Sequence, residues 1–359
     1  MNNKVMVAMS GGVDSSVAAA LLMEQGFDVV GATLKLFDNS EIGITSSNRT
    51  CCSLDDVTDA RSVARRLGFD HFVFNFGSLF QHEVIERFAQ SYCRGETPNP
   101  CIDCNRYIKF CKLLERAQLL DANYIATGHY ARISFDEKSG RYLLLKAKDL
   151  SKDQSYVLYN LTQDELSKVI FPLGELRKSE VRLLAEQREL VNARKPDSQD
   201  ICFVPDGDYA GFLKNVIGIP SSSGNFVNRD GQVLGIHQGH IHYTIGQRKG
   251  LRLSFDRPKY VVGIDAAANT VTLGDESELY HSEMTIGDLN WVAIERLVEP
   301  IRVQVKIRYS QSEVPAIIHP FDDQSVKVIL EQTQRAVTPG QAAVFYQGDV
   351  VIGGGRIVS

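Results

Sequence analysis

Short apolar runs and amphipathic segments alternate along the first half of the chain. Continuous apolar runs predict four buried strands, and helical spacing of apolar positions predicts the helices between them. The predicted strands cover residues 5–9, 29–36, 72–76 and 124–127. The predicted helices cover residues 14–25, 57–67 and 79–92. Because such alternation favours a parallel sheet with helices on both faces, the pattern predicts an α/β fold.

The second half of the chain has a different pattern. Beyond about residue 205, glycines and turn dipeptides separate short β-rich runs, which are typical of small β-domains. These runs cover residues 261–264, 271–273, 303–307, 326–330 and 343–346. We therefore expect three domains: an α/β domain with a parallel sheet over 1–205, a small central β-rich domain over 206–278, and a C-terminal β-barrel over 279–359.

Composition narrows the class of protein. The 359 residues are 43% hydrophobic and 23% charged, which is ordinary for a globular protein and excludes a disordered or collagen-like chain. We expect no membrane partner and a cytoplasmic location, because no run of about 18 apolar residues and no secretory signal pattern is present. The net charge of −5 means that a nucleic acid would have to bind at a local basic patch.

All seven cysteines lie in the first 202 residues. An odd number in a chain of this size does not indicate a disulfide scaffold. It points to catalytic, redox or metal-binding thiols, with burial as a small apolar side chain as the alternative for most of them. The cysteines are Cys51, Cys52, Cys93, Cys101, Cys104, Cys111 and Cys202.

A glycine-rich segment joins the first predicted strand to the first predicted helix. It reads Ser10-Gly11-Gly12-Val13-Asp14-Ser15-Ser16. Glycines permit a tight turn, and the free N–H groups at a helix N-terminus form an anion site. The missing Gly-Lys-Ser/Thr sequence excludes a Walker-type loop. The alternative is a simple turn in which Asp14 only caps the helix.

This segment resembles the phosphate loop of the ATP pyrophosphatase superfamily, whose members use ATP to adenylate a carbonyl oxygen and release pyrophosphate. The resemblance implies bound ATP, and Mg²⁺ should accompany it because the phosphates need charge neutralisation. The resemblance assigns nucleotide contacts to the glycine-rich loop, to the end of the second predicted strand, and to a glycine that follows the fourth predicted strand. These residues are Ala8, Met9, Ser10, Gly11, Gly12, Val13, Asp14, Ser15, Leu34 and Gly128.

Three further segments narrow the resemblance. They cover residues 97–105, 195–203 and 243–250, and we expect the first to be a proline-stiffened loop leading into a helix over 107–118. With shorter matches at 127–130, 152–156, 306–309 and 338–341, they resemble the bacterial tRNA-specific 2-thiouridylases over nearly the whole chain. That family replaces the C2 oxygen of the wobble uridine with sulfur. The first domain would then bind ATP and perform the chemistry, while the other two hold the tRNA.

Two cysteines fit this chemistry. Adenylation turns the C2 oxygen into a good leaving group, and a thiolate or persulfide is the natural sulfur nucleophile. By resemblance, Cys202 carries the persulfide sulfur and Cys104 is the nucleophile or resolving thiol, so that a Cys104–Cys202 disulfide would close the cycle. The sulfur would come from a donor protein, either a relay protein or a cysteine desulfurase.

Cys101 departs from one form of the family pattern, which has an aspartate suited to acid–base work at this position. The trio Cys101, Cys104 and Cys202 could instead hold a [4Fe-4S] cluster with one open iron site. Zinc is a weaker alternative because only three thiolates are evident. The identity of the general base therefore stays open.

Contacts with tRNA need basic and aromatic groups. Basic residues gather over 237–259, around Lys146 to Lys152, and in the strand that ends at Arg308 and Tyr309. The resemblance assigns tRNA contacts to Asn99, Pro100, Cys101, His129, Lys152, Asp153, Gln154, Arg308, Tyr309 and Gln341. The alternative for each charged cluster is an ordinary solvated surface.

Other functions remain open at this point. Another ATP pyrophosphatase, such as an amidotransferase-linked synthetase or a tRNA lysidine-type ligase, would carry the same loop, but the settings of Cys104 and Cys202 argue against it. A non-catalytic RNA-binding or redox thiol protein is the alternative from a different class.

Overall fold

The computed structural model describes residues 3–37, 54–197, 201–204 and 207–359. These residues form two compact units. Unit 1 contains residues 1–85, 100–207 and 349–351, and unit 2 contains residues 86–99, 208–348 and 352–359. None of the described helices is long and apolar enough to cross a lipid bilayer.

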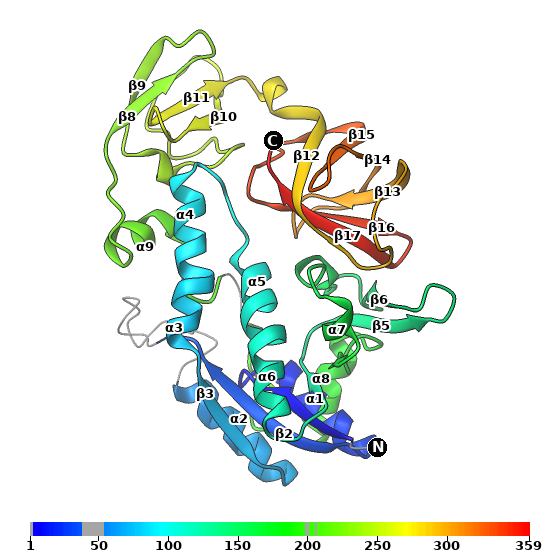
Figure 1. The fold of residues 1–359 in the computed structure, drawn as a ribbon. Coiled ribbons are helices and arrows are strands. Elements are labelled where there is room, and N and C mark those ends of the chain that lie inside the picture. Colours follow the sequence, from blue (N-terminus) through cyan, green and yellow to red (C-terminus); the bar gives the residue numbers. More distant parts are fainter. Residues whose placement is uncertain (1–2, 38–53, 198–200, 205–206) are drawn as a thin grey trace. The chain divides into compact units, whose positions relative to one another are not determined.

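A five-stranded parallel sheet forms the centre of unit 1 (Figure 1). Its order is β3 (His71–Asn75), β2 (Asp28–Lys35), β1 (Lys4–Ala8), β4 (Tyr124–Ala126) and β7 (Val169–Ile170). The three central residues of β1 have no exposed surface, as expected for a strand that is covered on both faces. The predicted parallel α/β sheet is confirmed.

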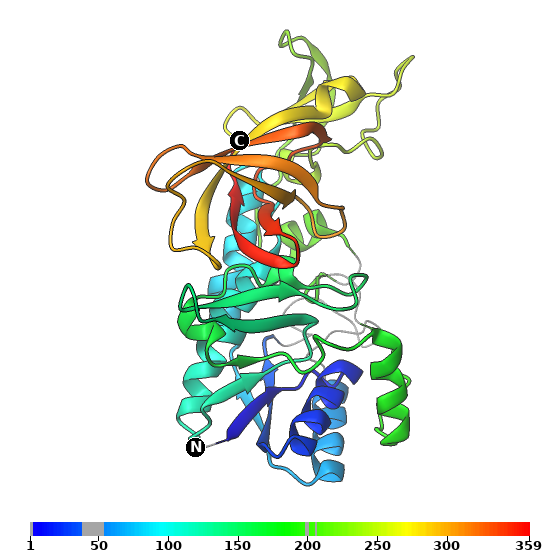
Figure 2. The same cartoon turned by 90° about the vertical axis from the view of Figure 1, so that its right-hand side faces the viewer.

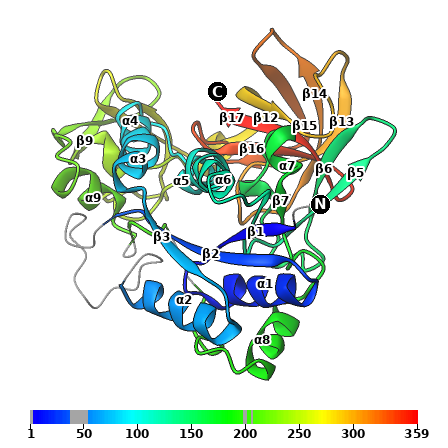
Figure 3. The same ribbon diagram turned by 60° about the horizontal axis from the view of Figure 1, so that its bottom comes forward.

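Helices cover both faces of this sheet (Figure 3). One face carries α1 (Val13–Glu24) and α2 (Leu54–Leu67), and α8 (Lys178–Gln187) packs on the outer side of α1. The other face carries a helical segment composed of α5 (Pro100–Asp103), η2 (Cys104–Lys112) and α6 (Leu113–Gln118). Apolar residues of α1, β1 and α8 share one core, which places the start of α1 firmly at the end of β1.

The prediction of a loop over 97–105 was partly wrong, because the helix already begins at Pro100. Proline is favoured in the first helical turn, where its fixed φ suits the helix and its missing N–H costs nothing. Cys101 and Cys104 therefore lie on helical turns. The predicted helix over 79–92 is confirmed as α3 (Gly77–Phe80), η1 (Gln81–Glu86) and α4 (Arg87–Cys93), in which η1 is π-helical.

The rest of unit 1 connects these layers. It contains a hairpin of β5 (Ala131–Asp136) and β6 (Arg141–Lys146), the short helix η3 (Ser155–Val157) and α7 (Gln163–Leu166). All three residues of η3 are buried, so this single turn is held rigidly within the unit.

Unit 2 is mainly β-structure. A four-stranded sheet has the order β10 (Tyr260–Asp265), β11 (Thr270–Gly274), β8 (Gly224–Val227) and β9 (Val233–His237). It accompanies α9 (Tyr209–Asn215), η4 (His240–His242) and η5 (Glu276–Leu279). The core of this sheet is a small apolar cluster centred on Phe226 and Val261.

Six further strands close into a barrel, coloured yellow to red in Figure 2. They are β12 (Tyr280–Trp291), β13 (Ile301–Lys306), β14 (Val314–Pro320), β15 (Val326–Arg335), β16 (Ala342–Gln347) and β17 (Val350–Ile357). The barrel closes because β12 pairs with both β15 and β17. This confirms the predicted C-terminal β-barrel.

Candidate functional site

The glycine-rich loop runs from the end of β1 at Ala8 to the first residue of α1 at Val13. Gly11 has a φ of +69°, and a Cβ atom there would lie 2.7 Å from the Cα of Asp56. Gly12 is the extended N-cap residue of α1. Only glycine fits at position 11, so the chain turns tightly enough to direct N–H groups of the helix N-terminus toward one point.

Hydroxyl groups fix the conformation of this loop. Ser15 Oγ accepts a hydrogen bond from Ser10 N (3.3 Å) and donates to Gly12 O (3.2 Å), and Ser16 Oγ also donates to Gly12 O (3.0 Å). Asn192 Nδ2 donates to Gly11 O and to Ser16 Oγ, each at 2.9 Å. The loop is therefore preorganised by its own side chains and by Asn192.

Asp14 lies at the start of α1 in a network of charges. Both of its carboxylate oxygens accept from Lys178 Nζ, at 2.7 and 2.8 Å, and Tyr130 Oη donates to Oδ1 at 2.8 Å. Lys178 Nζ also lies 2.8 Å from Asp197 Oδ1. Burial would raise the pKa of Asp197, but hydrogen bonds from Lys178 and Lys152 outweigh it and hold that pKa at about 2.

A second lysine lies on the other side of the loop. Lys195 Nζ donates to Asp56 (2.7 Å), to Asp59 (2.6 Å) and to Gly11 O (3.3 Å). Burial would lower the pKa of Lys195, but the two carboxylates raise it above its usual range. Lys195 thus stays charged, and the loop can attract an anion such as a phosphate group.

Two other predicted nucleotide contacts also lie at this end of unit 1. A Cβ atom on Gly128 would lie 2.7 Å from Ser15 N and 2.8 Å from Asp14 C, so this glycine, two residues after the end of β4, packs directly on the start of α1. Leu34 is buried in β2, opposite Phe74 of β3. Since the carboxyl ends of parallel strands meet at one edge, this edge is the expected ligand site of an open α/β sheet.

The two predicted catalytic cysteines both belong to unit 1. Cys104 is 7% exposed, and Cys202 is half-buried. Two buried asparagines hold the helix around Cys104: Asn105 Nδ2 donates to Val157 O (2.8 Å), and Asn160 Nδ2 donates to Ile102 O (3.2 Å). Phe203 packs edge-on against Phe80, which fixes the residue after Cys202.

Burial raises the pKa of Cys93 and of Cys111, which suits inert thiols rather than nucleophiles. Cys51 and Cys52 lie outside the described residues. Cys101 is exposed, whereas Cys104 three residues later is buried.

The trio Cys101, Cys104 and Cys202 does not form a metal-binding group. Across the described ranges of the chain, no three His, Cys, Asp or Glu side chains are arranged to hold a metal ion. A cluster ligated by three cysteines requires their sulfur atoms to converge. The described residues therefore do not fit the [4Fe-4S] hypothesis.

Several residues predicted to contact tRNA are part of the charge network of unit 1. Lys152 Nζ lies 2.9 Å from Asp197 Oδ2, and Gln154 Oε1 accepts from Tyr130 N at 2.9 Å. Asp153 is buried and accepts from Ala147 N and from Ser155. His129 lies against Phe110 and Phe171, and burial lowers its pKa, so its imidazole is neutral.

Unit 2 contains the remaining predicted tRNA contacts except Pro100 and Cys101, which lie in unit 1. Arg308 Nη2 donates to Ala336 O (2.9 Å) and Thr338 Oγ1 (2.8 Å), while Tyr309 is 43% exposed. Gln341 Nε2 donates to the main-chain oxygen of residue 97 at 2.7 Å, so this turn fastens the segment that leads to Asn99.

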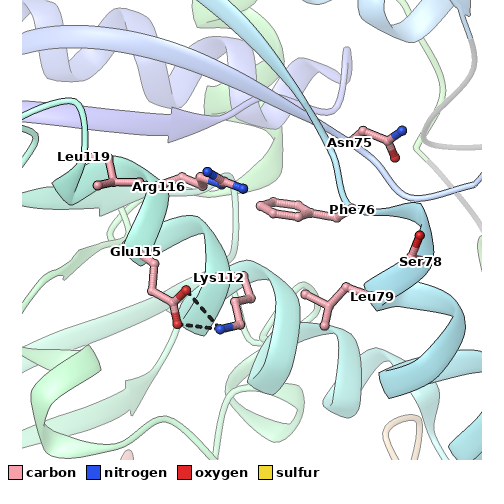
Figure 4. A pocket seen from close by; sticks show the side chains of 8 residues that line it. All are labelled: Asn75, Phe76, Ser78, Leu79, Lys112, Glu115, Arg116 and Leu119. Atoms are coloured by element: carbon pink, nitrogen blue, oxygen red, sulfur yellow. Dashed lines mark hydrogen bonds and ion pairs between the residues drawn. The ribbon is translucent and has the colours of Figure 1, made fainter.

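A cavity of about 540 Å³ lies at the end of β3, beside η2 and α6 (Figure 4). Its lining includes Phe76, Leu79 and Arg116, together with the Lys112–Glu115 ion pair. None of the predicted site residues lines it. A second pocket lies in unit 2. Its lining is basic and includes Arg248, Arg252, Arg257 and Lys259.

Comparison with known proteins decides the family. The chain is 51% identical over 354 residues to the tRNA-specific 2-thiouridylase MnmA of Acetivibrio thermocellus, which covers 99% of each chain. It is 47% identical over 357 residues to the MnmA of Clostridioides difficile, covering 99% of this chain and 98% of the relative. The chain belongs to the tRNA-specific 2-thiouridylase family. The resemblance inferred from the motifs is thereby confirmed.

Family models also match each part of this 2-thiouridylase family member. A tRNA methyl transferase HUP domain matches residues 3–206, a tRNA methyl transferase PRC-barrel domain matches 210–275, and an aminomethyltransferase β-barrel domain matches 281–357.

The sequence analysis did not assign roles to the side chains that surround the glycine-rich loop. Lys178, Tyr130, Asn192 and Lys195 lie 116 to 184 residues away from their partners. Tyr130 and Lys195 lie in the matched segments 127–130 and 195–203 but had no assigned role, whereas no local pattern marks Lys178 or Asn192.

Proposed function

We propose that the protein is an ATP-dependent tRNA 2-thiouridylase that acts on the wobble uridine. The observation that supports this most is the position of Asp14. At the N-terminus of α1, its carboxylate contacts Lys178 and Tyr130 beside a glycine loop whose geometry suits anion binding. The same unit contains Cys104 and Cys202. Family membership supplies the reaction class.

The loop binds and orients the phosphates of ATP. The N–H groups at the start of α1 and the ammonium groups of Lys178 and Lys195 offset the negative charge that develops on pyrophosphate. Asp14 is the carboxylate that would hold Mg²⁺, which usually takes one or two carboxylates together with phosphate oxygens. Bound Mg²⁺ supplies charge neutralisation. Attack of the uracil C2 oxygen on the α-phosphorus then releases pyrophosphate.

Sulfur transfer uses the two cysteines in turn. Cys202 carries a persulfide, and its terminal sulfur attacks C2, so that a C–S bond forms and AMP leaves with the C–O bond electrons. The Cys104 thiolate then attacks Cys202 Sγ. The electron pair of the broken S–S bond stays on the sulfur attached to C2, which gives 2-thiouridine and a Cys104–Cys202 disulfide. An external thiol must reduce that disulfide before the next cycle.

The partners follow from this scheme. A sulfur-donor protein, either a relay protein or a cysteine desulfurase, loads Cys202, and the tRNA supplies the wobble uridine in the cytoplasm. Asn99, Pro100 and Cys101 precede Cys104 along the chain and are suited to contact the target base. His129, Lys152–Gln154, Arg308, Tyr309 and Gln341 are the other proposed tRNA contacts. No step is assigned to an iron–sulfur cluster, because the described residues contain no group of side chains arranged to hold a metal ion.

The test is mass spectrometry of nucleosides from unmodified tRNA after incubation with ATP, Mg²⁺ and a persulfide donor. We expect 2-thiouridine at the wobble position and one pyrophosphate released per thiolation. The matched comparison is a tRNA whose wobble base is cytidine, which should give neither product. Pyrophosphate release without thiolation of any tRNA would contradict the proposed function and favour another ATP pyrophosphatase activity.

A further inference from the structure

A continuous set of contacts joins the nucleotide loop to Cys104 inside unit 1. It starts at Asp14, whose Oδ1 accepts from Tyr130 Oη at 2.8 Å. Tyr130 and Gln154 then form two hydrogen bonds of 2.9 Å, one from Tyr130 N to Gln154 Oε1 and one from Gln154 N to Tyr130 O. A displacement of the Asp14 carboxylate therefore acts on Gln154 through one aromatic side chain.

The second half of this path is a rigid turn. Val157 N donates to Gln154 O at 3.0 Å, which closes the buried helix η3. The next contact is from Asn105 Nδ2 to Val157 O at 2.8 Å, and Asn105 directly follows Cys104. Asn160 adds a second contact, to Ile102 O. Residues 102–105 are thus held by the segment that Gln154 begins.

Asn105 and Asn160 each have a buried oxygen atom that a purely structural role does not explain. They are 1% and 3% exposed, and the carboxamide oxygen of each is buried without a hydrogen-bond partner in the described part of the chain. A buried acceptor without a partner costs free energy that an apolar side chain of the same size would avoid. Packing alone does not account for two such asparagines around the helical turn that contains Cys104.

We propose that Tyr130, Gln154 and Asn105 are positioning residues that couple the occupancy of the nucleotide loop to the accessibility of Cys104. Phosphate groups in the loop compete with Asp14 for Lys178, since both bind the same ammonium group. Asp14 then shifts, and with it Tyr130 and the η3 turn. The clamp on residues 102–105 loosens, and the buried thiol becomes accessible once the nucleotide is bound. This order suits a reaction in which sulfur chemistry must follow adenylation.

The inference rests on the proposed function, because it takes the loop as the ATP site and Cys104 as a reacting thiol. Coupling of two sites requires that a ligand at one changes the state of the other. The measured quantity is the alkylation rate of Cys104 by iodoacetamide, quantified on the peptide that contains it. Because Cys104 is only 7% exposed, this rate reports how tightly its segment is held.

The experiment compares the full-length wild type with Tyr130→Phe and Asn105→Leu, each with and without a saturating, non-hydrolysable ATP analogue and Mg²⁺. In the wild type we expect the analogue to raise the alkylation rate at least threefold. Tyr130→Phe removes only the hydroxyl that reaches Asp14 and should abolish most of this rise. Asn105→Leu should raise the basal rate and also abolish the response. A merely structural loss would change the basal rate but not the ratio.

Gln163→Met is the control, because the Gln163 side chain also binds the main chain of a tyrosine away from the path: its Oε1 accepts from Tyr142 N at 2.8 Å and its Nε2 donates to Tyr142 O at 2.9 Å. It should respond like the wild type. A wild-type rise below twofold, or a rise in Tyr130→Phe at least half as large as in the wild type, overturns the coupling. Calorimetry with the analogue separates the two hypotheses: absent binding contradicts the proposed function, whereas binding without a Cys104 response contradicts only the coupling.

Discussion

The ammonium group of Lys178 lies 2.7 and 2.8 Å from the two carboxylate oxygens of Asp14, although 164 residues separate them in the sequence. Both residues lie in the first turn of a helix, Asp14 in α1 and Lys178 in α8. Two helix N-termini thus meet at one ion pair. An arriving polyphosphate would find a cation that the fold has already positioned, and the charge of Asp14 is compensated until then.

Lys178→Met should impair adenylation much more than tRNA binding. The variant keeps most of the side-chain volume but removes the charge, and loss of one preorganised charged donor costs roughly 100-fold in rate. The measurement is pyrophosphate release in the presence of tRNA. Lys168→Met is the control, since Lys168 forms an ion pair with the exposed Asp164 one turn earlier. A decrease of less than threefold in the Lys178 variant would leave Asp14 and Lys178 as a structural ion pair.

The nucleotide loop was predictable because all of its signals are local. A buried strand, two glycines and a helix start lie within a few residues, and the predicted strand over 5–9 and helix over 14–25 match β1 and α1 within one residue. Lys178 and Asn192 were not predictable, because their role depends on how α8 and the segment after it pack on α1. Such long-range contacts leave no periodic pattern in the sequence.

The other differences between the sequence predictions and the structure concern where helices begin and what the charged residues contact. The two prolines near Cys101 predict a loop, but Pro100 begins a helix, so Cys101 and Cys104 lie on helical turns. The cluster around Lys152 was assigned to tRNA by resemblance. In the structure its cation already contacts Asp197, a relationship that a count of basic residues does not show.

Gly128→Ala should weaken ATP binding at least tenfold. The added methyl group would lie 2.7 Å from Ser15 N, and therefore must push either β4 or the start of α1 out of place. Gly263→Ala is the matched control, because its methyl group would lie 3.6 Å from its nearest neighbours, in ordinary contact. Calorimetry with ATP measures the effect. Unchanged affinity in both variants would show that the loop does not depend on this close approach.

Cys202→Ser should abolish thiolation but leave ATP binding unchanged. Serine keeps the size of the side chain and removes the sulfur atom that would carry the persulfide. The measurements are nucleoside analysis for 2-thiouridine and calorimetry for ATP. Cys93→Ser is the control, because burial raises the pKa of that thiol and it lies in unit 2. Thiolation by the Cys202 variant at the normal rate would remove this residue from the mechanism.

The stability of the protein should fall as the pH drops below the ordinary His range, partly because of His71. Thr33 Oγ1 donates to Met9 O, so His71 Nε2 must donate to Thr33, and the buried Nδ1 is left as the basic atom. Burial, with a smaller effect from Arg61, lowers the pKa of His71 to about 4. The unfolded chain therefore binds the proton first, and stability is lost between pH 6.5 and about 4.

Urea unfolding of the wild type and of His71→Gln between pH 7 and 4.5 measures this contribution. Glutamine keeps a donor for Thr33 but does not titrate, so the variant should lose less stability over this range than the wild type. His82→Gln changes an exposed histidine and should behave like the wild type. If His71→Gln and the wild type showed the same pH dependence of stability, His71 would not be the group responsible for the loss.

Arg308 has a structural contact that its predicted role in tRNA binding does not require. Its guanidinium donates to Ala336 O and Thr338 Oγ1, which holds a turn in which Ala336 has a φ of +56°. Hydrogen bonds made by a charged group contribute about 1.5–3 kcal/mol, and both of these come from one nitrogen atom. Arg308→Ala should therefore lower the free energy of unfolding of unit 2 by about 2 kcal/mol, as measured by urea unfolding.

The same variant tests the tRNA contact through its salt dependence. If Arg308 also meets a phosphate, the slope of the logarithm of the binding constant against the logarithm of salt concentration should decrease by about 0.7–0.9. Arg302→Ala is the control, because Arg302 is 72% exposed, pairs with Glu331 and should change stability by less than about 1 kcal/mol. We expect both effects for Arg308. A lower stability with an unchanged slope would confine Arg308 to the turn that precedes Gln341, and tRNA would then be held by neighbouring residues such as Tyr309.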